Sequence, residues 1–92
     1  MRITVHYYGQ LRYLAERDTE LVEIGNGDDF IGVLRRTSTS YDAEFSKILF
    51  NGEQGFCACV MVLVNNEPIP RGAVPALRDG DFVSLIPAIS GG

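Results

Sequence analysis

The chain opens with a segment in which apolar and polar side chains alternate. In residues 2–8, Ile3, Val5 and Tyr7 fall at every second position. Because successive side chains of a strand point to opposite faces, this alternation predicts a strand with one buried face. His6 falls on the polar face, and we interpret it as a solvated surface residue rather than a catalytic group, since no nucleophile is spaced to use it.

Four later segments are also predicted strands, one of them short. Residues 19–24 are close enough to the first strand along the chain to pair with it antiparallel. The run at 56–64 is rich in β-branched residues and bounded by turn signals, so we expect a central strand covered on both faces. A short strand near Pro68 can only be incompletely paired. The last strand covers 82–86 and ends at Pro87, which has no N–H to continue the ladder.

One segment between the second and third strands has helical spacing. Asp28 or Asp29 can cap a helix by accepting hydrogen bonds from the free backbone N–H groups that follow. The buried stripe of this predicted helix consists of Phe30, Val33, Leu34, Thr37 and Tyr41. Residues 10–17 predict a short turn of helix or an ordered loop, and residues 42–56 could contain a second short helix.

The order of these elements predicts an α+β fold of the β-grasp, ubiquitin-like type. In this arrangement a mixed sheet has one main helix packed on one face, and the first and last strands lie side by side in its centre. We expect the β-grasp domain to cover residues 1–86. Residues 87–92 are expected to form a flexible tail that ends in Gly-Gly.

Size and charge narrow the classes of protein that remain. The chain has 92 residues, enough for one domain, and a formal net charge of −4. Its basic residues are scattered, which argues against a nucleic-acid partner. The longest apolar run is far shorter than the ~20 residues that span a bilayer, and no signal peptide is recognisable. We therefore expect a cytoplasmic protein with no membrane partner.

The two cysteines, Cys57 and Cys59, fall in the third predicted strand. Residues i and i+2 of a strand share a face, but extended geometry does not suit a disulfide between them. Together with His6 they are too few for a four-ligand zinc site unless carboxylates or a second chain help, so no metal is predicted. An iron–sulfur ferredoxin is excluded, because it requires four cysteine ligands. We interpret them as free thiols in a reduced protein.

The two ends of the chain resemble the ubiquitin-like sulfur carriers of the MoaD/ThiS family, and most of all the small subunit of molybdopterin synthase. The segments YYGQLRYLA, VNNEPI and LRDGDFV and the tail IPAISGG are similar to family patterns in their order and spacing. The matching positions before the tail are Leu11, Arg12, Leu14, Val64, Asn65, Ile69, Leu77, Asp79, Gly80, Asp81 and Val83. Ala88 stands where the molybdopterin group commonly has a second proline, and residues 35–56 match no family pattern.

The resemblance implies a carrier rather than an enzyme. An E1-like adenylating enzyme would use ATP to convert the Gly92 carboxylate to an acyl-adenylate, and sulfur would then displace AMP to leave a thiocarboxylate. Gly91, Ser90 and Ile89 would thread the tail into the partner's active site, where the absence of a Cβ makes glycine suited to a narrow channel. The resemblance implies a molybdopterin synthase large subunit as second partner and no bound cofactor.

The last strand also offers a candidate docking surface. If Val83 and Leu85 point inward, Phe82 and Ile86 point outward beside the tail and could bind a partner. The alternative is that the segment at 42–56 covers them.

Three other functions remain open at this stage. The sulfur could serve thiamin or cysteine biosynthesis, or the activated Gly92 could be joined to a lysine of another protein. The chain could also be a β-grasp binding module with an incidental Gly-Gly ending.

Overall fold

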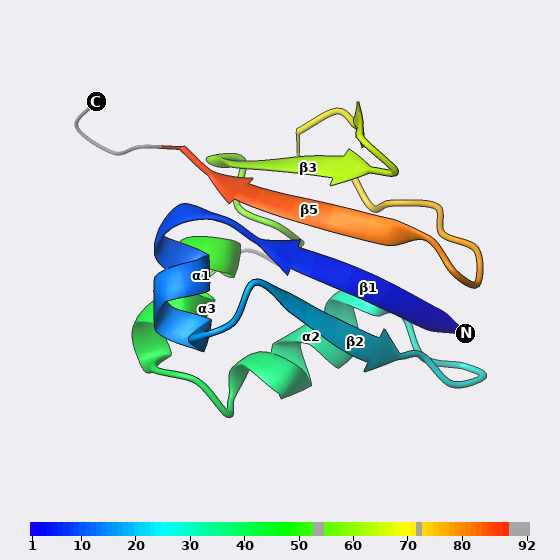
Figure 1. Cartoon of the computed structure of the whole chain (residues 1–92), viewed down its shortest axis with the longest axis horizontal. Helices are drawn as coiled ribbons and strands as arrows, with labels where there is room; N and C mark the ends of the chain where they lie inside the picture. The colour runs from blue at the N-terminus through cyan, green and yellow to red at the C-terminus, as the bar shows by residue number, and fades with distance from the viewer. Residues whose placement is uncertain (53–54, 72, 89–92) are drawn as a thin grey trace.

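A computed structural model describes residues 1–52, 55–71 and 73–88. Its sheet has five strands in the order β2-β1-β5-β3-β4 (Figure 1). The elements follow the chain as β1 (Arg2–Tyr7), α1 (Gly9–Ala15), β2 (Thr19–Glu23), α2 (Phe30–Ser38), α3 (Ala43–Phe50), β3 (Val60–Val64), β4 (Glu67–Pro68) and β5 (Phe82–Pro87). The β1–β5 pair is parallel and the other pairs are antiparallel. This mixed sheet confirms the predicted β-grasp fold.

The two central strands combine the first and last parts of the chain. Val5 lies opposite Val83, and Tyr7 lies opposite Leu85. All four side chains point to the inner face and are at most 2% exposed. Because β1 and β5 run in the same direction, their carboxyl ends lie at the same edge of the sheet, where α1 begins (Figure 1).

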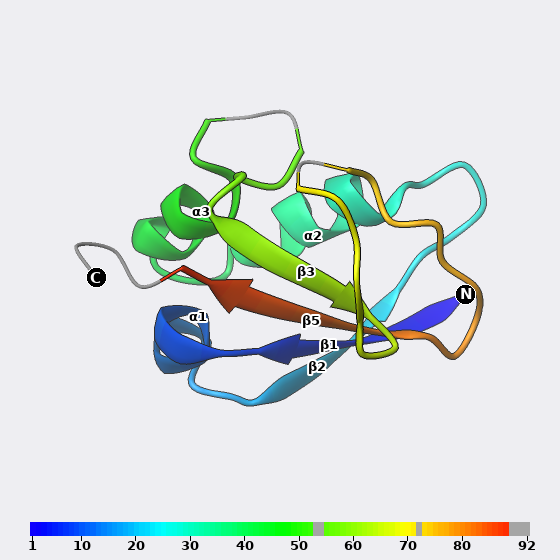
Figure 2. The same cartoon turned by 90° about the horizontal axis from the view of Figure 1, so that it is seen from above.

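Helices α2 and α3 lie on the inner face of the sheet, and α1 closes the core at the edge where β1 and β5 end (Figure 2). Asp29 caps α2 by accepting a hydrogen bond of 2.6 Å from the Gly32 amide. The helix ends at Ser38. Tyr41 was predicted to belong to it, but lies beyond its end. The segment that the sequence left open contains α3, capped where Asp42 accepts from the Glu44 amide at 2.9 Å.

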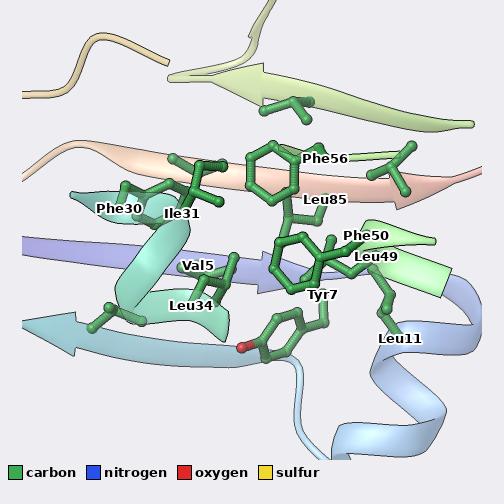
Figure 3. Packing of buried hydrophobic residues seen from close by; sticks show 14 of the residues in the cluster. Val5, Tyr7, Leu11, Phe30, Ile31, Leu34, Leu49, Phe50, Phe56 and Leu85 are labelled. Atoms are coloured by element: carbon green, nitrogen blue, oxygen red, sulfur yellow. The ribbon is translucent and has the colours of Figure 1, made fainter. Parts of the chain in front are cut away.

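Aromatic side chains fill the core between the helices and the sheet (Figure 3). The ring of Phe56 stacks on that of Phe50, with centroids 5.9 Å apart, and Phe30 contacts Phe56 edge-on at 6.1 Å. Tyr7 meets Phe45 edge-on at 5.3 Å. The α3 segment, for which the sequence offered no family pattern, therefore supplies much of the core.

Strand β3 is shorter than predicted and is covered on one face only. The chain turns at 57–59, where the Val60 amide donates to the Cys57 carbonyl at 2.9 Å, and the strand begins at Val60. Met61 points to the outer face and is 44% exposed. The prediction of a fully covered strand was wrong because the apolar run includes a core-packing turn as well as a strand.

A polar cluster joins β1, β2 and the connection between α2 and α3. The hydroxyls of Tyr7 and Tyr41 both donate to Glu20 Oε1, at 2.6 and 2.8 Å. An Arg17 guanidinium nitrogen lies 3.6 Å from the other carboxylate oxygen. Burial and the Glu20 carboxylate raise the pKa of Tyr41 to about 12, and the same causes raise the pKa of Tyr7.

The turn before β5 is fixed by two polar side chains. Asp81 accepts hydrogen bonds from the Asn65 side-chain amide at 3.0 Å and from the Arg78 backbone at 2.8 Å. The Asn65 carbonyl oxygen in turn accepts from the Phe82 amide at 3.0 Å. These hydrogen bonds lower the pKa of the Asp81 carboxyl, and the bond from Asn65 has the largest effect.

Candidate functional site

The root of the tail lies where the central strands end. β5 continues to Pro87, and the Ala88 amide donates to the Cys59 carbonyl at 2.8 Å. Gly9 lies beside this point, since a Cβ placed on it would be 3.5 Å from Pro87 Cγ, and its φ of +55° suits glycine. The predicted tail residues Ile89, Ser90, Gly91 and Gly92 lie outside the described residues.

An open groove adjoins the tail root. Its volume is about 810 Å³, and it lies between the start of α1, the exposed side of α3 and the end of β5. The lining combines apolar groups from Ile48 and Pro87 with the charged side chains of Glu44 and Lys47. Cys59 also lines the groove.

The predicted docking residues lie on the sheet face opposite the helices. Phe82 and Ile86 are half-buried and alternate with the fully buried Val83 and Leu85. The Phe82 ring contacts that of His6, with centroids 5.3 Å apart. The segment at 42–56 packs its buried side chains into the core on the other face, so it does not cover them.

Other apolar side chains extend this face. Met61 lies opposite Ile86 across the β3–β5 pair, and Leu21 lies on the same face of β2, where it is 59% exposed. We call Leu21, Met61, Phe82 and Ile86 the outer apolar face. Sequence reasoning identified its β5 members but missed Met61, because the run around it was taken to be buried on both sides.

The cysteines contradict the prediction of free thiols. Cys57 and Cys59 form a disulfide, with their Cα atoms 5.2 Å apart. The prediction assumed an extended strand, whereas the turn at 57–59 brings the two Cα atoms within disulfide range. In the described part of the chain no cluster of three or more His, Cys, Asp or Glu side chains could hold a metal ion.

A family comparison decides what kind of protein carries this tail. The ThiS family model matches residues 5–92. The chain belongs to the ThiS family. The resemblance seen at the two ends of the sequence is therefore confirmed, and members of this family are small carrier proteins. A comparison with the sequences of curated proteins finds no match.

Several solved structures share the fold along the whole chain. The Haloferax volcanii HVO 2177 protein is 24% identical at a TM-score of 0.80, covering 100% of this chain and 87% of its own. The small archaeal modifier protein 1 (SAMP1) from Methanosarcina acetivorans is 24% identical at 0.72, with coverages of 99% and 96%. Subunit 1 in the complex of subunits 1 and 2 of the Helicobacter pylori molybdopterin-converting factor is 18% identical at 0.55, each chain covered completely.

Within the described residues, no helix is both long and apolar enough to cross a membrane.

The groove beside the tail root was not found from the sequence, because Lys47 and Cys59 are brought together by tertiary packing alone.

Proposed function

We propose that this ThiS-family protein carries sulfur as a thiocarboxylate on Gly92, as the small subunit of a molybdopterin synthase. The Gly92 carboxylate is activated as an acyl-adenylate by an E1-like partner in the cytoplasm, with ATP bound by that partner and no cofactor bound by this chain. Sulfur then displaces AMP. The observation that carries the proposal is the family match, which runs through the Gly-Gly sequence to Gly92.

The position of the tail root supports this function. Ala88 is held by the Cys59 carbonyl at the edge of the sheet, beside an open groove. The four residues that follow can reach at most about 14 Å when extended. A partner therefore has to dock closely, and the groove and the Ile86–Met61 end of the outer apolar face lie beside the tail root.

A direct test measures the mass of the intact protein. The protein is incubated with an E1-like adenylating enzyme, ATP and a sulfur source, and the expected gain is the difference between sulfur and oxygen. A matched control has one residue appended after Gly92, which should prevent the gain. An unchanged mass under conditions that convert a known carrier would refute the proposal.

Docking is tested with Phe82→Asp and Ile86→Asp. Since charge in a desolvated contact removes a hot spot, each change should weaken binding of a synthase large subunit at least about tenfold. A large subunit is used as the partner because the similar Helicobacter pylori structure is a complex of subunits 1 and 2 of a molybdopterin-converting factor. Val74→Asp is the control, because Val74 is 68% exposed and lies outside the outer apolar face. Equal affinities for all three variants, each with a native circular dichroism spectrum, would contradict this docking surface.

A second candidate is a protein modifier, favoured by the fold similarity to SAMP1. Activation would be identical, but the acyl group would pass to a lysine amine. Conjugates linked through Gly92 in a cell extract would favour this function, while transfer of sulfur without conjugates would favour the carrier. Sulfur transfer to thiamin or cysteine biosynthesis differs only in the acceptor, which a reconstituted assay with each acceptor enzyme would identify.

A further inference from the structure

The disulfide between Cys57 and Cys59 has one accessible and one inaccessible side. Cys59 is exposed and lines the groove, whereas Cys57 is 6% exposed and belongs to the core cluster. A soluble sulfur nucleophile can therefore approach the Cys59 sulfur but not the Cys57 sulfur.

The turn that carries the disulfide is attached to the tail root. The Cys59 carbonyl accepts from Ala88, the Cys57 amide donates to the Leu49 carbonyl at 2.8 Å, and Arg71 donates to the Ala58 carbonyl at 2.7 Å. These bonds join the turn to the end of β5, to α3 and to the segment after β4. Chemistry at Cys59 therefore takes place beside Ala88, the residue from which the tail departs.

We propose that the Cys57–Cys59 disulfide is a thiol–disulfide exchange site. In this exchange an anionic sulfur nucleophile attacks Cys59 Sγ. The new bond joins the incoming sulfur to Cys59, the Cys57–Cys59 bond breaks, and its electron pair leaves on Cys57 as a thiolate. No external oxidant or reductant is needed, because the disulfide is exchanged for another disulfide.

The local electrostatics favour the same direction. The Cys59 amide donates to Cys57 Sγ at 3.2 Å, and this hydrogen bond stabilises the thiolate that departs. Cys59 Sγ instead lies 4.0 Å from the Ile48 carbonyl oxygen, near the carboxyl end of α3, where partial negative charge disfavours a thiolate. Attack at Cys59 thus combines the accessible sulfur with a leaving thiolate on Cys57 that accepts a backbone hydrogen bond.

Two sources could supply the nucleophile. One is a small thiol in its thiolate form. The other rests on the proposed function: a thiocarboxylate on Gly92 is itself an anionic sulfur nucleophile, and its attack would form an acyl disulfide between Gly92 and Cys59. Ala88 donates a hydrogen bond to the Cys59 carbonyl and lines the same groove as Cys59, so the last described residue before the tail lies beside the exchange site.

The first arm of the test uses the protein with its ordinary carboxylate and glutathione as the probe. After brief reaction at mild alkaline pH and quenching with acid, free thiols are alkylated and peptides are mapped by mass spectrometry. Glutathione should be on Cys59 and the alkyl group on Cys57 in at least about tenfold excess over the reverse pattern. The reverse pattern, or two free thiols in the protein purified without reductant, would overturn the proposal. The mapping needs no substitution, so misfolding cannot confuse it.

The second arm uses protein whose Gly92 thiocarboxylate is made chemically, by cleaving a thioester fusion with sulfide. Sulfide is removed and the cysteines are then oxidised. A Gly92–Cys59 link that reductant opens would identify the tail as a source, whereas glutathione reactivity without this link would assign the site to small thiols. If neither reaction occurred, the proposal of an exchange site would be overturned. Because no activating enzyme takes part, failure of the proposed function leaves both results unaffected.

Discussion

The cluster around Glu20 predicts a measurable loss of stability when the Tyr7 hydroxyl is removed. Tyr7 is only 2% exposed, and its hydroxyl donates a hydrogen bond of 2.6 Å to the Glu20 carboxylate. Hydrogen bonds to charged groups contribute about 1.5–3 kcal/mol. Tyr7→Phe should cost about 1.5–2 kcal/mol, the lower part of that range, because Glu20 keeps Tyr41 and Arg17 as partners.

The matched variants separate this bond from general loss of packing. Glu20→Leu leaves the buried Tyr7 hydroxyl without its acceptor and should cost about 3 kcal/mol, since an orphaned buried group adds about 1–3 kcal/mol. The double variant Tyr7→Phe/Glu20→Leu removes both partners of the bond together. Its cost should therefore be smaller than the sum of the two single costs, by about 1 kcal/mol or more. Tyr41→Phe should cost less than Tyr7→Phe, since Tyr41 is only half-buried and water can replace its hydroxyl.

The assay is urea denaturation at neutral pH, followed by circular dichroism, with an unchanged dependence on denaturant as the sign of two-state behaviour. A cost below about 0.5 kcal/mol for Tyr7→Phe, or additive costs in the double variant, would refute the reasoning. Alkaline pH gives a second measurement. Since the pKa of Tyr41 is raised to about 12, an unfolded tyrosine ionises first, and the free energy of unfolding should fall between about pH 10 and 12. Tyr41→Phe should flatten this fall, and an unchanged slope would contradict the assignment.

Three further predictions concern the supports of the fold. Asp29→Ala removes the cap of α2 and should cost about 1 kcal/mol in urea denaturation, whereas an exposed aspartate such as Asp18 changed to Ala should cost less. Leu85→Ala, at a position 0% exposed between the central strands and the helices, should cost about 2–5 kcal/mol, and a cost below 1 kcal/mol would show that the site collapses around the change. Because the Asp81 pKa is lowered, its contribution is present above the unfolded pKa of about 3.9 and is lost as pH falls through the folded value. NMR titration should give an Asp81 midpoint below that of Asp81 in Asn65→Ala, and equal midpoints would exclude the Asn65 bond as the cause.

The fold could be predicted where pattern and geometry coincide. The alternation of Ile3, Val5 and Tyr7 specifies which face of β1 is buried, because strand side chains alternate whatever the tertiary context. Asp29 could be identified as a candidate helix cap for the same reason, since capping depends on the next few residues. The family resemblance also rests on local segments, the turns and the tail.

Errors arose where one stretch serves two structural roles. Phe56–Val64 reads as a single apolar run, yet its first part turns through the core and its second part is β3. Hydrophobicity reports burial but not direction, so the sequence could not divide the run. The same error concealed the disulfide, because the distance between Cys57 and Cys59 depends on whether the chain turns between them.

The sequence by itself determined the alternating strands, the capped helix and the glycine ending that the family shares. Only the tertiary structure decided which residues gather at the tail root. Gly9, Lys47, Cys59 and Ala88 come from four separate parts of the chain and meet because β1 and β5 end at one edge of the sheet. Such a meeting depends on long-range pairing and packing, for which no local pattern of side chains can substitute.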